Sequence, residues 1–283
     1  MLLLLPGLPD VASAADERPL PRSTAGPGSP EFSQSRSFRH VRRLAGRIGP
    51  RPAGSPAYQQ AVRYVDRVFG RYGYVTTQVA FDVPGVGQSW NVVASWPGGG
   101  EPRVVIGAHL DTVPGSPGGN DNASGVATLL ETARVLAQTG ETEGLELVAF
   151  GAEERQPSGG HHYGSQAYVD ALGAKERQDL DLMVSVDMIG KVRRYIAGWL
   201  GTGPRSAVRR LSKAVRAAGY KVDVRAVGDV SDHGPFALAN IPAAVLWTGL
   251  EPHWHSPGDV VGNVAPKSLT RGGAVLAELL ARV

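Results

Sequence analysis

A nearly continuous apolar run that ends in metal-binding residue types constrains this chain more than any other feature. The sequence VVIGAHLDTVPGSPGGNDNASG at 104–125 begins with apolar residues and then presents His109, Asp111 and Asp121 in a loop rich in proline and glycine. A short apolar run without polar alternation is typical of a central strand that is covered on both faces. The stretch therefore predicts a buried strand whose carboxyl end opens into a polar site.

The rest of the chain alternates strand and helix patterns. Strands are expected over 75–83, 90–96, 103–109, 145–151, 182–187, near 195, and over 222–226 and 243–247. Helices are expected from about 37 to 49 and over 56–73, 122–137, 165–171, 204–218, 231–239 and 266–282. Alternation of this kind produces a largely parallel sheet between helical layers. We therefore predict a single α/β domain of three layers, αβα, with a mostly parallel central sheet.

The first 36 residues differ in composition from the rest. The start, MLLLLPGLPDVASAADERP, has a short apolar run and an Ala-Ser-Ala sequence suited to signal-peptide cleavage, although it lacks a positive n-region. Residues 16–36 are rich in proline, glycine, serine and charge, which is typical of a disordered linker. We expect a signal peptide over 1–15, hence a secreted protein, a linker over 16–36 and the folded domain over 37–283. A disordered tail is the alternative for 1–15.

Composition excludes several classes of site and partner. The 283 residues include no cysteine, which excludes thiolate ligands, a cysteine nucleophile and disulfides. The formal net charge is +3 and the basic residues are scattered, so no nucleic-acid partner is expected. Beyond the start, no segment approaches the ~20 apolar residues of a membrane span, so no membrane partner is expected. We expect a monomer.

Four of the expected strands are followed by residue types that bind metals. In open α/β sheets, ligands bind outside the carboxyl ends of the strands, so these side chains should meet in one cleft. We expect Asp121 to bridge two metal ions there. The other candidates are His109 and Asp111, Glu153 and Glu154, Asp187, and, after a short loop, His255.

Spacing and charge indicate how these groups divide the work. His109 and Asp111 are two residues apart, so they point to the same side of an extended chain, and Asp111 can accept the second N–H of a metal-bound His109. Glu153 and Glu154 point to opposite sides, which lets one bind metal while the other acts on a substrate. Three metal-bound carboxylates and a bridging hydroxide would balance two divalent cations. Imidazole with carboxylate favours zinc, although cobalt or manganese would fit a similar set.

Six motifs in a fixed order across 51–264 resemble those of the secreted bacterial di-zinc leucine aminopeptidases, which have a zinc-exopeptidase fold. They are GAHLDTVPGSPGGNDNASG, FGAEE, YGSQAYV, SVDMIG, SDHGPF and HSPGDVVGNV. The resemblance implies two zinc ions, one held by His109, Asp121 and Asp187, the other by Asp121, Glu154 and His255. It implies further that Glu153 is the general base, that Asp111 orients the histidine ligand, and that the Asp121–Asn122 peptide bond is cis. The expected substrates are peptides with a free N-terminus, from which the N-terminal residue is hydrolysed.

Two features depart from that family. Trp254 stands where the aminopeptidases usually carry tyrosine, and the segment RQPSGGHH at 155–162 is longer than the usual connection. Both features resemble the related glutaminyl-peptide cyclotransferases, which use a single zinc, whereas NDNASG at 120–125 resembles the aminopeptidases. We therefore predict a di-zinc aminopeptidase with a cyclotransferase-like enzyme as the alternative. A non-catalytic binding domain on the same fold is a remoter alternative, because every expected ligand and the base are present.

Several polar residues near these motifs have competing interpretations. His253 is an alternative ligand to His255, but the Ser-Pro-Gly-Asp sequence that follows favours His255. The histidine pair at 161–162 is expected at the rim of the cleft or without a role. His233 is expected in the cleft wall or in the first turn of a helix. Asp259 either supports the site or caps a backbone turn.

Overall fold

The computed structural model describes residues 31–140 and 143–282. The expected signal peptide and the expected linker up to residue 30 lie outside these ranges. The end of the linker was placed wrongly, because helix α1 (Gln34–Val41) begins three residues before the expected start. The Ser33 side chain caps this helix by accepting the Arg36 N–H, and the Ser33 N–H donates to Glu131 at 2.8 Å. The polar residues before 37 are therefore the exposed first turn of a helix.

The core of the molecule is one eight-stranded sheet with the order β1-β2-β4-β3-β5-β8-β6-β7. The neighbours β4, β3, β5 and β8 are parallel, whereas β1 and β2 add an antiparallel edge and β6 runs antiparallel to β8. This confirms the predicted mostly parallel sheet. The strands are β1 (Val75–Val83), β2 (Gly87–Ser95), β3 (Val104–His109), β4 (Leu145–Phe150), β5 (Leu182–Val186), β6 (Tyr195–Trp199), β7 (Val222–Ala226) and β8 (Ala243–Trp247).

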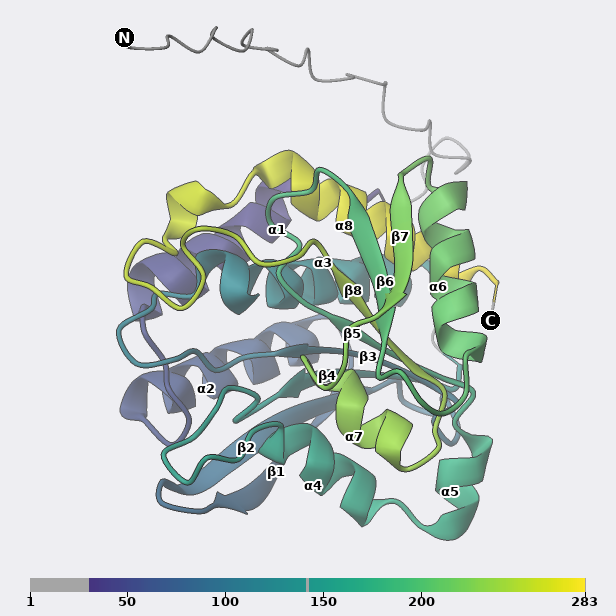
Figure 1. Cartoon of the computed structure of the whole chain (residues 1–283), viewed down its shortest axis with the longest axis horizontal. Helices are drawn as coiled ribbons and strands as arrows, with labels where there is room; N and C mark the ends of the chain where they lie inside the picture. Colours follow the sequence, from purple (N-terminus) through teal and green to yellow (C-terminus); the bar gives the residue numbers. More distant parts are fainter. Residues whose placement is uncertain (1–30, 141–142, 283) are drawn as a thin grey trace, which may run out of the picture.

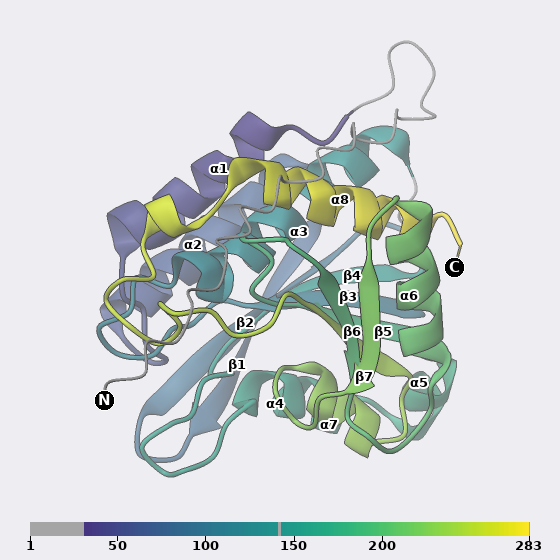
Figure 2. The same ribbon diagram turned by 45° about the horizontal axis from the view of Figure 1, so that its top comes forward.

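Helices cover both faces of the sheet and confirm the three-layer architecture. In Figure 1, α1, α3 and α8 lie above the sheet and α4 and α7 below it, and the turned view in Figure 2 keeps the same layers. The remaining α-helices are α2 (Pro56–Arg71), α3 (Ser124–Thr139), α4 (Tyr163–Ala171), α5 (Ala174–Asp179), α6 (Ser206–Ala217), α7 (His233–Leu238) and α8 (Pro266–Leu280). A wider helical segment, Arg42–Ile48, continues α1. Among the described residues no helix is both long enough and apolar enough to cross a membrane.

Strand β3 shows why an apolar run becomes a central strand. Ile106 and Ala108 pack in the core beneath α2 and α3, whereas Val105 packs in the opposite core with residues of α4 and α7. Every residue of β3 is buried, because alternate side chains enter two different helical layers. The strand therefore ends inside the molecule, and the residues that follow it form the floor of a site.

The sequence patterns missed helix α5, and the reason is physical. Its six residues, AKERQD, bury none of their side chains, so the helix lacks the apolar spacing that identifies a helix in a sequence. The predicted strand over 90–96 also begins three residues earlier, because Gly87 pairs with Val83 across the tight turn to β1. Neither difference affects the site.

Candidate metal centre

Neighbouring strand ends bring the candidate ligands together. His109 is the last residue of β3, Asp187 follows β5 directly, and Glu154 comes shortly after β4. His255 lies in the loop after β8, and Asp121 lies in the turn between β3 and α3, where the backbone of Asp121 and Asn122 is not helical. Because β4, β3, β5 and β8 are parallel neighbours, their carboxyl ends share one edge of the sheet. Five side chains that are far apart in the sequence therefore meet in one place.

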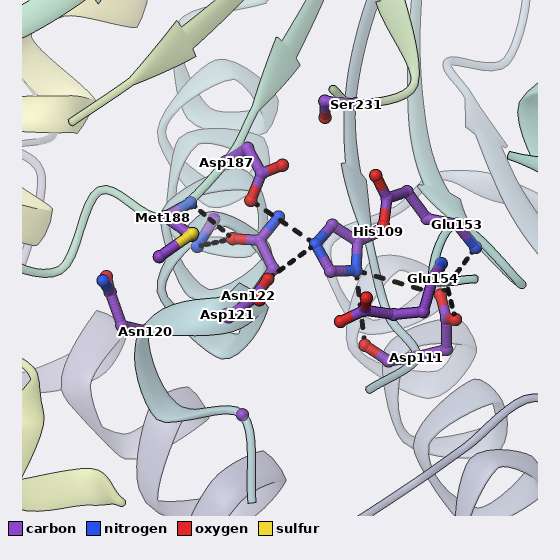
Figure 3. Close-up of polar contacts among 12 residues, drawn as sticks. His109, Asp111, Asn120, Asp121, Asn122, Glu153, Glu154, Asp187, Met188 and Ser231 are labelled. Atoms are coloured by element: carbon purple, nitrogen blue, oxygen red, sulfur yellow. Dashed lines mark hydrogen bonds and ion pairs between the residues drawn. The ribbon is translucent and has the colours of Figure 1, made fainter. Parts of the chain in front are cut away.

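Asp121 is shared between two groups of candidate ligands. Its Oδ1 lies 3.0 Å from His109 Nε2, and Asp187 Oδ1 lies 3.4 Å from the same nitrogen. Its Oδ2 lies 3.4 Å from His255 Nε2, which is also 2.8 Å from Glu154 Oε2. In each group the three candidate ligand atoms lie within 4.8 Å of one another. Figure 3 shows Asp121 and Asp187 on the same side of the His109 ring. Asp121 thus contributes one carboxylate oxygen to each of two neighbouring groups that could hold a cation.

The carboxylates of this cluster need compensation by positive charge. Glu154 Oε1 is buried and accepts no hydrogen bond within the described part of the chain. Burial, and then the charge of Asp121, raises the pKa of Glu154 to about 8, and burial also raises the pKa of Asp187. Buried carboxylates are costly unless they are paired or bind metal. Two imidazoles with three carboxylates form a donor set that fits two zinc ions.

Asp111 holds the segment that carries both glutamates. Its carboxylate accepts the N–H of Glu153 at 3.0 Å and the N–H of Glu154 at 3.2 Å. The same carboxylate lies 3.8 Å from His109 Nδ1, longer than a hydrogen bond, and the Asp111 backbone oxygen is nearer at 3.3 Å. The expected hydrogen bond from His109 to the Asp111 side chain is therefore absent. The two backbone N–H groups take up the carboxylate, and they fix both glutamates beside His109.

The turn that carries Asp121 is held by buried polar groups. The Asp259 carboxylate accepts the backbone N–H groups of Asn120 and Asp121 at 2.7 and 2.9 Å. Asn122 Nδ2 donates to the Val186 carbonyl at 2.8 Å, which connects the turn to β5. The Asp121–Asn122 peptide bond is cis, as the family resemblance implied. Both interpretations of Asp259 apply, because its carboxylate caps the backbone of the turn and that turn carries Asp121.

Replacing Asp259 with alanine is expected to weaken zinc binding by roughly 10- to 100-fold, as is typical when a group that orients a ligand is removed. The reason is that the N–H groups of Asn120 and Asp121 lose their acceptor and the Asp121 carboxylate loses its fixed position. Competition with a fluorescent zinc chelator measures this. Asp223→Ala serves as the control, because Asp223 forms an exposed ion pair with Arg194 at the far edge of the sheet. Equal zinc affinity of the two variants would contradict the expected role.

Sequence patterns did not single out Arg51, a fully buried cation beside the site. Its guanidinium donates to the carbonyl oxygens of Leu110 at 2.6 Å, Pro117 at 2.7 Å and Gly118 at 3.2 Å. Burial lowers the pKa of Arg51 to about 10, so the side chain stays charged at neutral pH. These hydrogen bonds fix the Pro/Gly-rich loop that precedes Asp121. A lone arginine between two expected helices carries no sequence signal for this role.

Of the competing histidines after β8, only His255 joins the cluster among the described residues. His253 is exposed and belongs to none of the candidate metal groups. Trp254 stacks on the His255 ring, with ring centroids 3.8 Å apart and planes at 25°. The indole therefore covers the outer face of a candidate ligand. His233 is buried as the first residue of α7.

The expectation that the pair at 161–162 lies at the rim or has no role was wrong for His162. Its side chain is buried, and its Nε2 lies 2.9 Å from Glu153 Oε1. Its Nδ1 lies 3.1 Å from Asp229 Oδ1. The sequence signal was present, since the longer segment at 155–162 ends in this histidine. The signal did not predict the contact with Glu153, because that contact requires the chain to fold back after Glu154.

Comparisons with known proteins identify the family of the chain. Residues 91–280 match the model of peptidase family M28. Leupeptin-inactivating enzyme 1 of Streptomyces exfoliatus is 31% identical over 236 residues, which cover 80% of this chain and 52% of that protein. The chain therefore spans about half the length of this relative.

Solved structures share the fold at low sequence identity. A zinc aminopeptidase from Bacillus subtilis superposes with a TM-score of 0.78 at 18% identity, covering 90% of this chain and 95% of that one. Porphyromonas gingivalis glutaminyl cyclase gives a TM-score of 0.78 at 21% identity, covering 89% and 98%. Because the family model extends over most of the domain, from the strand before the site to the last helix, the chain belongs to peptidase family M28.

Proposed function

We propose that this protein is a zinc-dependent aminopeptidase with two zinc ions per chain. One ion is held by His109, Asp121 and Asp187, and the other by Asp121, Glu154 and His255. The observation that carries the proposal is that the two carboxylate oxygens of Asp121 face two different histidines. A single-ion site has no need for that arrangement.

The roles of the surrounding residues follow from their positions. Zinc ions bound there would lower the pKa of a water molecule and polarise the carbonyl of the scissile peptide bond. Glu153 lies beside His109 and Glu154, where its carboxylate accepts a proton from the attacking water and returns it to the amine that leaves. The carboxylates around the ions accept hydrogen bonds from the α-ammonium group of a peptide. The substrate is therefore a peptide with a free N-terminus.

A second candidate function rests on a specific feature. Trp254 precedes His255 here, as tryptophan precedes the last ligand in the glutaminyl-peptide cyclotransferases, and a glutaminyl cyclase shares the fold. A cyclotransferase would release ammonia from an N-terminal glutamine and would use one zinc. Two separate groups that share Asp121, one with His109 and Asp187 and the other with Glu154 and His255, favour two ions and hence the peptidase.

A paired assay separates the two functions. We expect release of p-nitroaniline from leucine p-nitroanilide, no release from the N-acetylated substrate, and no ammonia from a peptide that begins with glutamine. Activity should be lost after treatment with a chelator and return with two zinc equivalents per chain. Ammonia release without p-nitroaniline, restored by a single equivalent, would establish the cyclotransferase instead.

A further inference from the structure

His162 lies between two carboxylates, one of them on the proposed base. Its Nε2 is 2.9 Å from Glu153 Oε1, and its Nδ1 is 3.1 Å from Asp229 Oδ1. The side chains of His162 and Glu153 are 5% and 10% exposed, whereas that of Asp229 is 37% exposed. The three residues form a chain from the solvent to the centre of the site.

The backbone builds this contact. The N–H groups of His162, Tyr163 and Gly164 donate to the carbonyl oxygens of Glu153, Ala152 and Gly151, respectively, at 2.9 to 3.0 Å. A Cβ atom on Gly164 would lie only 2.2 Å from the Gly151 oxygen, so this close approach requires glycine. The segment after Glu154 is thus folded back as a closed loop. His162 is held against Glu153 by main-chain bonds rather than by a flexible side-chain contact.

The environment of His162 favours an imidazole with both nitrogens protonated. Burial by itself lowers the pKa of His162, but the hydrogen bonds to Asp229 and Glu153 outweigh it and raise the pKa to about 10. Both N–H groups then donate, one to each carboxylate. One oxygen of Glu153 contacts His162, and the other accepts no hydrogen bond from the residues that the structure describes, so it can take a proton from water. A general base must be aimed as well as close, and a displacement of about 1 Å can cost 10²-fold in rate.

We propose that His162, anchored by Asp229, is a positioning residue that fixes the carboxylate of Glu153 for proton transfer. This inference rests on the proposed hydrolysis. In that reaction, water adds its hydroxyl group to the carbonyl carbon and the C–N bond breaks. The proton travels from water to the free oxygen of Glu153 and on to the amine nitrogen. The protons on His162 stay where they are throughout the reaction, and its role is to hold the other oxygen.

Two substitutions at 162 test the donor directly. His162→Leu should lower kcat roughly 10²-fold with KM changed less than twofold, because His162 is buried and acts through Glu153. His162→Gln should recover about tenfold of that loss, since its amide N–H can reach the place of the histidine Nε2. Zinc should stay at two per chain in both variants. Asp223→Ala is again the control, because Asp223 forms an exposed ion pair with Arg194 at the far edge of the sheet, and this variant should retain activity within twofold.

Asp229 provides a second test, on a residue whose side chain is partly exposed. Asp229→Asn should lower kcat about five- to tenfold, and it should have no further effect in the His162→Leu protein, because the two residues act in series. Unchanged kcat in His162→Leu, or additive losses in the double variant, would overturn the proposal. So would a loss of zinc that parallels the loss of activity.

The same cluster has a competing use that the experiment distinguishes. His161 Nδ1 lies 2.9 Å from His162 Nδ1, and with Asp229 these atoms form a group that could hold a cation. A third zinc ion per chain that disappears in His161→Leu would show that metal binding, not positioning, explains the cluster. A wild-type protein without peptidase activity would refute the proposed function itself, whereas full activity in His162→Leu would refute only this inference.

Discussion

Replacing Glu153 with glutamine is expected to lower kcat by about 10⁴-fold while the protein keeps two zinc ions. Proton transfer by a positioned side chain contributes up to about that factor, and an amide cannot accept a proton. The substitution preserves shape, and its amide oxygen can still accept the hydrogen bond from His162. Glu153 also belongs to neither of the two groups that share Asp121. Single-turnover kinetics with leucine p-nitroanilide, together with metal analysis of the same sample, measure both quantities.

The neighbouring glutamate is the matched control for this experiment. Glu154→Gln removes a charged oxygen that lies 2.8 Å from His255, so this variant should lose zinc as well as activity. The two substitutions are chemically identical and one residue apart. If Glu153→Gln lost zinc and Glu154→Gln kept it, the roles assigned to the pair would have to be exchanged.

The sheet and the meeting of the candidate ligands were predictable, because they depend on local patterns and on one topological rule. The apolar runs before His109 and Asp187 are buried on both faces, which leaves a distinct signal in the sequence. Parallel strands place their carboxyl ends at one edge, so the residues that follow them had to meet. These two features were sufficient to predict from the sequence that His109, Asp187 and Glu154 lie close together.

The supporting groups were not predictable, because each depends on a contact between distant segments. Arg51 donates hydrogen bonds to three backbone carbonyl oxygens at and before the loop around 117. Every residue has such an oxygen, so no sequence pattern identifies these acceptors. His162 reaches Glu153 only because main-chain bonds fold the intervening loop back. The Asp111 carboxylate accepts hydrogen bonds from two backbone N–H groups and not from His109, because the local path of the chain brings those N–H groups to it. Side-chain partners of backbone groups are the part of a site that patterns miss.

Replacing Asp121 with asparagine is expected to remove both zinc ions and to reduce activity below detection. Each group of ligands contains one Asp121 oxygen, so a single substitution takes a charged ligand from both. Asparagine keeps the size of the side chain, but it carries no charge and presents an N–H group, which cannot bind zinc, to one of the two ions. We expect zinc content to fall from two per chain towards zero at micromolar free zinc. Inductively coupled plasma analysis after dialysis against buffered zinc measures the content.

The variant Asp187→Asn is the comparison that tests whether Asp121 is shared between two ions. Asp187 belongs to only one of the two groups, so this variant should lose one ion and keep the other on Glu154 and His255. Zinc also stabilises a fold that binds it, in proportion to RT ln(1 + [Zn]/Kd). Added zinc should therefore raise the Tm of the wild type most, of Asp187→Asn less, and of Asp121→Asn hardly at all. Loss of just one ion from Asp121→Asn would mean that the carboxylate serves a single cation, and the two-zinc mechanism would fall with it.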